Sequence, residues 1–153
     1  MHPCGHVCLG FFGEQNCLPC LEKDCLDKYN KENQVKIPND CTSDQYCHIC
    51  WSEELAAKPC IWLDCQHVFH LDCIMKKVKG RWFSPRIVFG FLNCPECKLK
   101  ISAAYCPELT KETTEIVAFE KLVMKKALER AKFEGIDKEE RLKDPADYYY
   151  NKL

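Results

Sequence analysis

The chain has 153 residues, a formal net charge of −1 and 14 cysteines. That length suffices for one domain, or for two small ones that gain stability from metal ions. The near-neutral charge disfavours a nucleic-acid-binding protein, because such proteins usually present a clustered basic face. No apolar run reaches the ~18 residues of a membrane span, and no basic segment followed by an apolar one opens the sequence, so we expect neither a membrane protein nor a secretory signal.

Several cysteines occur in close pairs, and histidines lie beside or between the pairs. The pairs with two intervening residues are Cys17/Cys20, Cys47/Cys50 and Cys94/Cys97. Such a pair points both sulfurs at one ion from a single turn, whereas histidine has no role in a disulfide. Disulfides are the alternative, but they predominate in secreted domains. We therefore expect a zinc protein inside the cell, in the cytoplasm, the nucleus or both.

Residues 1–25 form an N-terminal Cys/His cluster. Its CxxC pair has the spacing of a zinc knuckle, so at least one zinc ion is expected here. There are more candidates than one ion needs, and the spacing does not select among them; Cys41 could complete a second site. We expect the cluster to be a structural extension of the domain that follows. Its candidate ligands are Cys4, His6, Cys8, Cys17, Cys20 and Cys25, with His2 beside them.

Residues 26–45 are polar and contain Pro38 followed by Asn39 and Asp40. Proline and asparagine–aspartate pairs interrupt regular structure and favour turns. The sequence therefore predicts a linker or a long loop between the N-terminal cluster and the next segment.

Residues 46–101 carry eight further ligands in four consecutive pairs. If the first two pairs bound one ion and the last two pairs bound the other, nothing would hold the two zinc sites against each other. Only two residues separate His67 from His70, which favours interleaved sites instead, because the crossed chain then fixes both ions in one rigid body. The first interleaved site takes Cys47, Cys50, His70 and Cys73, and the second takes Cys65, His67, Cys94 and Cys97.

The C-terminal third has a helical pattern followed by a polar tail. Apolar residues recur at three- and four-residue steps between residues 107 and 135, and Gly135 is a plausible C-cap. We expect the apolar stripe to pack on the zinc domain or on a partner segment. Residues 136–153 form the tail, whose three tyrosines are expected to begin another packed element. The stripe consists of Ile116, Phe119, Leu122, Val123, Ala127 and Ala131.

The order and spacing of the eight ligands resemble a RING domain in its two-histidine form. The resemblance implies a small zinc-stabilised α+β fold, a cross-brace with two structural zinc ions; a PHD or LIM arrangement is the alternative. Both sites have four protein ligands, which disfavours a zinc hydrolase, because catalytic zinc keeps an open position. The thiols outside the eight, Cys41, Cys60 and Cys106, are expected to be inert, so no catalytic residue is assigned.

RING domains bind E2 enzymes in a shallow groove, and four residues here match such contacts. Ile49 lies inside the first CxxC pair, Pro95 lies inside the last one, and Lys98 follows the last ligand. Many RING domains place a groove tryptophan where this chain has Lys77. Trp82 either reaches the groove from a long apolar insert or packs in the core. Alternatively, Ile49 is a buried residue that packs between the two zinc loops. Lys98 is, in the alternative reading, an ordinary solvent-exposed lysine with no role in binding.

The stretches LDCQHVFHLDC and GRWFSPRIVFGFLNCPECK, with the helix that ends ALERAKFEG, resemble the RING region of the Pam/Highwire ubiquitin ligases over about residues 45–150. The family consists of RING-Cys-relay ligases, which pass ubiquitin through two cysteines onto a hydroxyl group, notably that of threonine. Those cysteines belong to a tandem-cysteine domain after the linker helix. No cysteine follows Cys106 here, so no relay residue is assigned.

The expected function is an E3 ubiquitin ligase module that binds E2~ubiquitin through its RING and promotes transfer by positioning. Its partners are an E2, ubiquitin and a substrate protein that the sequence does not identify. The alternative is a non-catalytic zinc-binding scaffold. Lys77 and Glu96 favour the scaffold, whereas Ile49, Pro95 and Lys98 favour the ligase.

Overall fold

The computed structural model describes residues 1–34, 36–38, 41–81, 87–143 and 145. The chain divides into two compact units, Met1–Thr113 and Thr114–Leu153. The first unit contains all of the cysteines and histidines of the chain.

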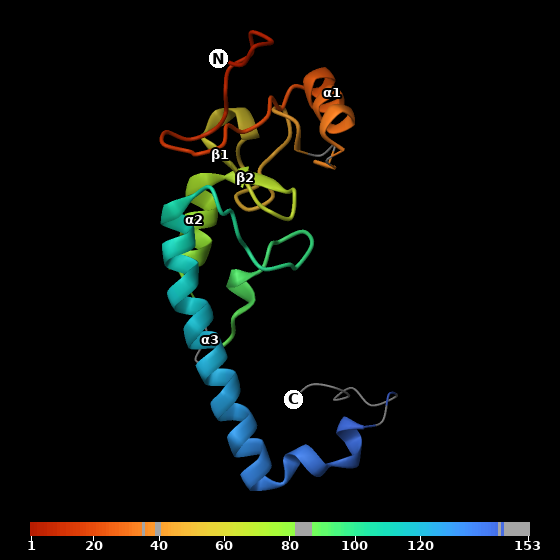
Figure 1. The fold of residues 1–153 in the computed structure, drawn as a ribbon, viewed down its shortest axis with the longest axis vertical. Coiled ribbons are helices and arrows are strands. Elements are labelled where there is room, and N and C mark those ends of the chain that lie inside the picture. Colours follow the sequence, from red (N-terminus) through yellow and green to blue (C-terminus); the bar gives the residue numbers. More distant parts are fainter. Residues whose placement is uncertain (35, 39–40, 82–86, 144, 146–153) are drawn as a thin grey trace. The chain divides into compact units, whose positions relative to one another are not determined.

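The first unit combines short helices with one small sheet (Figure 1). Strands β1 and β2 pair antiparallel, with Cys60 opposite His70 and Ile61 opposite Phe69. The named elements of this unit are α1 (Lys23–Asn33), β1 (Cys60–Trp62), β2 (Val68–His70), α2 (Leu71–Lys79), the start of α3 (Pro107–Glu134) and 3-10 turns at Leu55–Ala57 and Gly90–Leu92.

The β1–β2 hairpin separates two of the predicted ligand pairs. Its turn carries Cys65 and His67, and Gln66 between them has a left-handed φ of 75°. His70 ends β2 and is the N-cap of α2, and Cys73 lies in the first turn of that helix. The hairpin thus holds one pair at its tip and the other at its base.

A modest apolar core supports these elements. Ile61, Phe69, Ile74 and Val78 come from the hairpin and α2 and are fully buried. A second group of buried side chains lies in the N-terminal segment and the stretch after it. This group consists of Leu18, Leu21, Leu26 and Ile37.

The N-terminal segment packs against the hairpin. The Cys60 backbone N–H donates to the Leu9 carbonyl at 2.6 Å. The Phe11 ring stacks on Tyr105 with ring centroids 6.1 Å apart. These contacts tie the first 25 residues to the domain that follows them, within one compact unit.

The linker predicted for residues 26–45 is only partly correct, since Lys23–Asn33 form α1. This helix is polar and buries only Leu26, so its sequence lacks the repeated apolar positions by which helices are recognised. The Asn30 side chain then holds the returning chain, because it accepts from the Ile37 N–H at 3.1 Å and donates to the Ile37 carbonyl at 3.0 Å.

The second unit contains most of α3. The helix predicted for residues 107–135 spans Pro107–Glu134, and Gly135 follows it with φ of 74°. The apolar stripe is only partly covered: Ile116 and Ala131 are buried, whereas Phe119 and Leu122 are 41% and 53% exposed. Within the described residues no helix is long and apolar enough to cross a membrane.

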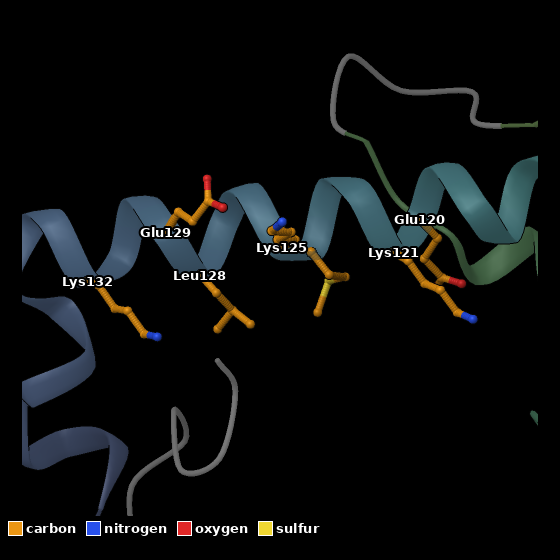
Figure 2. Close-up of a pocket in the computed structure, with 7 residues that line it drawn as sticks. Glu120, Lys121, Lys125, Leu128, Glu129 and Lys132 are labelled. Atoms are coloured by element: carbon orange, nitrogen blue, oxygen red, sulfur yellow. The ribbon is translucent and has the colours of Figure 1, made fainter.

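A shallow hollow lies on α3. In Figure 2, Leu128 and Lys132 point to one side of the helix and Glu129 to the other. The hollow is lined by Glu120, Lys121, Met124, Lys125, Leu128, Glu129 and Lys132.

The tail contains two 3-10 turns, Ile136–Lys138 and Glu140–Leu142. The three tyrosines at positions 148–150, which were predicted to begin a packed element, lie outside the described residues.

Tyr105→Phe tests how much the hydrogen bonds between the Tyr105 hydroxyl and strand β1 contribute to stability. The Tyr105 hydroxyl donates to the Trp62 carbonyl at 2.5 Å and accepts from the Trp62 N–H at 2.6 Å. Removing the hydroxyl leaves two backbone groups without their partner, so the free energy of unfolding should fall by about 1–3 kcal/mol. Urea unfolding of the zinc-replete chain measures the change. Tyr46→Phe, at an exposed side chain, is the control and should change stability by less than about 0.5 kcal/mol.

Candidate metal centres

The described residues bring cysteines and histidines together in four groups. In each group the ligand atoms all lie within 4.8 Å of one another. Two groups belong to residues 46–101 and two belong to the N-terminal segment.

The first group consists of Cys47, Cys50, His70 and Cys73. The His70 Nδ1 atom lies 3.7 Å from the Cys50 sulfur and 3.8 Å from the Cys73 sulfur. Its other ring nitrogen, Nε2, is 2.9 Å from the Glu54 carbonyl. A carbonyl can only accept, so Nε2 carries the hydrogen and the Nδ1 lone pair faces the sulfurs, which is the orientation a metal-binding imidazole needs.

The second group consists of Cys65, His67, Cys94 and Cys97. The hairpin turn supplies the first two, and the loop between the Gly90–Leu92 turn and residue 101 supplies the others. The His67 Nδ1 atom is buried and has no hydrogen-bond partner in the described structure. A buried nitrogen without a partner is costly in a protein interior. A metal ion among three thiolates would satisfy it.

The two CxxC loops share one backbone geometry. The N–H of Trp51 donates to the Cys47 carbonyl at 2.9 Å, and the N–H of Lys98 donates to the Cys94 carbonyl at 3.1 Å. Trp51 and Lys98 both have left-handed backbones, with φ of 54° and 63°. This conformation costs a non-glycine residue roughly 1–2 kcal/mol. Its occurrence after both pairs indicates that each loop curls tightly around one point.

The spacing of the ligand atoms fits tetrahedral zinc. Zn–S bonds of about 2.3 Å and Zn–N bonds of about 2.0–2.1 Å imply nitrogen–sulfur edges of about 3.6 Å in a tetrahedron. The nitrogen–sulfur distances at His70 are 3.7 and 3.8 Å. Those from His6 Nδ1 to the Cys20 and Cys25 sulfurs are both 3.5 Å. The donor set and its dimensions therefore suit zinc.

The thiols in these groups have unusual pKa values. A hydrogen bond from the Ser52 backbone N–H is the main cause that lowers the pKa of Cys50 to about 6. Burial raises the pKa of Cys65 to about 12 and raises that of Cys73 as well. Crowded thiols ionise reluctantly beside one another, and a divalent cation reverses this by stabilising the thiolates.

The N-terminal candidates separate into two groups. One consists of Cys4, His6, Cys20 and Cys25, with Cys25 in the first turn of α1. The other consists of His2, Cys8 and Cys17. The sequence placed His2 beside the candidate ligands without selecting it, since a lone histidine near a chain end has no spacing signal.

The remaining thiols lie outside all four groups. Cys41, Cys60 and Cys106 are buried. The Cys60 sulfur donates to the Leu55 carbonyl at 3.2 Å, and burial raises its pKa to about 12. A buried thiol with a raised pKa is a poor nucleophile, so Cys60 has the properties of an inert thiol.

The residues predicted to contact an E2 lie near the two CxxC loops, except for Trp82, which lies outside the described residues. Ile49 and Pro95 are half-buried within their loops, and Lys98 is exposed with Nζ against the Pro95 carbonyl. Lys77 on α2 is half-buried; its pKa is lowered by burial and then by the nearby charge of Lys98.

Sequence reasoning missed a bridge between the two loops. His48 Nδ1–H donates to the Glu96 carboxylate at 3.0 Å, so residues inside the two CxxC pairs hold each other. The ring of Trp51 stacks on His48 with centroids 4.6 Å apart and is 67% exposed. An exposed tryptophan directly after a CxxC pair is the signal that could have identified this surface.

Cys73→Ser tests the first group. Loss of one thiolate opens a closed zinc site, so the variant should lose about one zinc ion per chain and much of its folded structure. Metal analysis after dialysis, together with circular dichroism, measures both effects. Cys60→Ser removes a thiol of similar burial outside the groups and should retain the zinc content of the wild type; equal zinc in both variants would contradict the assignment.

Acidification should release zinc from the chain, because protons compete with the ion for the thiolates and imidazoles. The backbone N–H of Ser52, which lowers the pKa of Cys50 to about 6, favours the same thiolate that a metal ion would bind. Zinc content measured over a titration from neutral to acidic pH should therefore fall together with the circular dichroism signal. Folded structure that persists after the zinc is lost would contradict a structural role for the metal.

No protein-family model matches the chain. It is 41% identical over 150 residues to the E3 ubiquitin-protein ligase MYCBP2 of Danio rerio, covering 98% of this chain. It is 40% identical over 144 residues to the E3 ubiquitin-protein ligase highwire of Drosophila melanogaster, covering 90% of this chain. The chain spans only 3% of the length of each relative. Nearly the whole of this chain is thus similar to one short segment of each of these two E3 ubiquitin-protein ligases.

Proposed function

We propose that this chain is an E3 ubiquitin ligase module whose cross-brace RING recruits E2~ubiquitin and promotes ubiquitin transfer. The observation that carries the proposal is the interleaving of the two ligand groups of residues 46–101. The first and third ligand pairs share one group, and the second and fourth share the other. This crossed order is typical of a RING, and the relatives are named as E3 ubiquitin ligases.

Zinc has a structural role in this proposal. Cys47, Cys50, His70 and Cys73 would hold one ion, and Cys65, His67, Cys94 and Cys97 the other. Each set is complete with four protein ligands, so no position remains for a reactive water. The ions supply positive charge that keeps the thiolates ionised, and the chain gains the folding free energy of metal binding. At least one further zinc would occupy Cys4, His6, Cys20 and Cys25.

The E2 docks, in this proposal, across the two CxxC loops. Ile49 and Pro95 supply apolar contacts, and Trp51 adds an exposed aromatic ring on the first loop. The His48–Glu96 hydrogen bond fixes one loop against the other before the E2 arrives. Such preorganisation lowers the cost of binding, which matters for a small and transient interface.

In this proposal the chain promotes catalysis by positioning E2~ubiquitin. A RING holds E2~ubiquitin in a conformer whose thioester is ready for attack, and the attacking amine or hydroxyl comes from the substrate. Lys98 is exposed beside Pro95 and can donate to the E2 and to ubiquitin at once. Its left-handed backbone directs the chain away from the loop directly after the last ligand.

A non-catalytic scaffold is the second candidate. Lys77 stands where many RING domains place an apolar groove residue, and Lys98 is near enough to lower its pKa. Two neighbouring cations would favour an acidic partner over an apolar one. Thiols in zinc groups require reducing conditions, so under either function we place the chain in the cytoplasm, the nucleus or both.

Ile49→Ala tests the ligase. The zinc-replete chain should accelerate discharge of a ubiquitin-loaded E2 onto free lysine, and Ile49→Ala should reduce the rate at least about tenfold, because the apolar anchor of the interface is lost. Phe133→Ala, at a 92% exposed apolar residue of α3, is the matched control and should keep wild-type activity. If no E2 from a broad panel responds although zinc content confirms folding, the scaffold function replaces the ligase.

Lys98 provides a second test, with charge as the variable. Lys98→Glu should abolish acceleration, because a carboxylate cannot donate the bridging hydrogen bonds, whereas Lys98→Arg should retain or increase it. Discharge rates with free lysine and with free threonine as acceptors measure the effect and show which acceptor is preferred. Equal activity of the two variants would assign Lys98 to the solvated surface.

A further inference from the structure

We propose that His2, Cys8 and Cys17, closed by the carboxylate of Glu14, bind an additional zinc ion in the N-terminal segment. This site is separate from the RING groups and from the group of Cys4, His6, Cys20 and Cys25. It does not depend on whether the chain acts as a ligase.

The first argument is the position of the nitrogen and sulfur atoms. The Cys8 and Cys17 sulfurs lie 3.3 Å apart, and a ring nitrogen of His2 lies within 4.8 Å of both. His2 Nε2 is buried and has no hydrogen-bond partner in the described structure. The backbone fixes this approach, because the His2 N–H donates to the His6 carbonyl and the Gly5 N–H donates to the His2 carbonyl, both at 2.9 Å. A buried imidazole held toward two thiols is the arrangement of a metal ligand.

The second argument is the carboxylate of Glu14. Its Oε1 atom accepts from the Leu18 N–H at 3.3 Å and lies 3.9 Å from the Cys8 sulfur. Its Oε2 atom is buried without a partner in the described structure. A buried carboxylate oxygen without a partner is unfavourable unless a cation or a donor reaches it. Glu14 Oε1 already lies beside the Cys8 sulfur, but Glu14 is outside the group whose ligand atoms lie within 4.8 Å of one another, so its side chain would have to rotate to complete the site.

Gly10 makes room for this carboxylate. A Cβ atom at residue 10 would lie 2.1 Å from Glu14 Oε1 and 2.4 Å from Oε2. Any side chain there would displace the carboxylate, which is the mobile end of a flexible side chain. The glycine is therefore explained by the position of Glu14.

Zinc is the ion that fits this donor set. Two thiolates exclude calcium and magnesium, which prefer oxygen ligands. One imidazole and one carboxylate beside the thiolates favour zinc over copper(I), which prefers sulfur alone. The four side chains together carry three negative charges when they bind, so a divalent cation leaves one net negative charge.

The site would hold the N-terminal segment on the RING. Its ligands alternate along the chain with those of the neighbouring group, since Cys4 and His6 lie between His2 and Cys8. The loop from Cys8 to Cys17 contains Leu9, whose carbonyl accepts from Cys60 of β1, and Phe11, which stacks on Tyr105. An ion that closes this loop fixes both contacts to the hairpin.

Native mass spectrometry of the whole chain, purified with zinc under reducing conditions, tests the proposal. His2→Ala and Cys17→Ser should each hold one zinc ion fewer than the wild type while the RING ions remain. Chelator competition should show that Glu14→Gln and Gly10→Ala lower the affinity of one ion by at least about tenfold. Glu32→Gln, at an exposed glutamate of α1, is the control and should match the wild type.

Gly10→Ala keeps every ligand, so its result does not rely on a variant that has lost a donor. Cobalt substitution gives a second readout: Cys17→Ser should remove part of the thiolate-to-cobalt absorption. Unchanged zinc content in both His2→Ala and Cys17→Ser overturns the site, as does a Cys8–Cys17 disulfide in the reduced preparation. Unchanged affinity in both Glu14→Gln and Gly10→Ala overturns the role of Glu14.

Discussion

The structure depends on thiols and imidazoles that meet in groups although they come from distant parts of the chain. His70 lies at the end of a strand, yet its Nδ1 atom is 3.7 Å from the sulfur of Cys50, twenty residues earlier. Without a cation, burial and neighbouring thiols oppose ionisation in such a group, as the raised pKa of Cys65 illustrates. A zinc ion bound in such a group would reverse the sign of this interaction, so that a cost of folding would become a contribution to it. That contribution would supplement the modest apolar core.

The proposed function follows from the rigidity that the groups impose. The two CxxC loops lie at separate ligand groups, but the His48–Glu96 hydrogen bond joins them. Ile49 and Pro95 thus lie on loops that this hydrogen bond links to each other. A surface of this kind can bind a partner with little loss of entropy. Its contribution to ubiquitin transfer is then orientation, which needs no nucleophile, and the buried state of Cys41, Cys60 and Cys106 agrees with that role.

The N-terminal segment contains Cys/His groups of the same kind as residues 46–101. It has its own ligand groups, and it reaches the hairpin through Leu9, Phe11 and Tyr105. The hairpin in turn carries members of both Cys/His groups of residues 46–101. The N-terminal groups and the groups of residues 46–101 are therefore joined through contacts of the β1 strand. We expect the stability of this unit to depend on all of its Cys/His groups together and not on a single one.

The sequence by itself predicted the two groups of four Cys/His residues in residues 46–101 and the long helix, because ligand spacing and helical periodicity are local patterns. Only the tertiary structure divided the N-terminal Cys/His residues into groups and related Glu14 to one of them, since this depends on neighbours that the fold supplies. It also revealed α1, a polar helix that the single buried Leu26 anchors, and the His48–Glu96 bridge. The difference is physical: residues a few positions apart constrain each other through the backbone, whereas residues 48 positions apart meet only after the chain has folded.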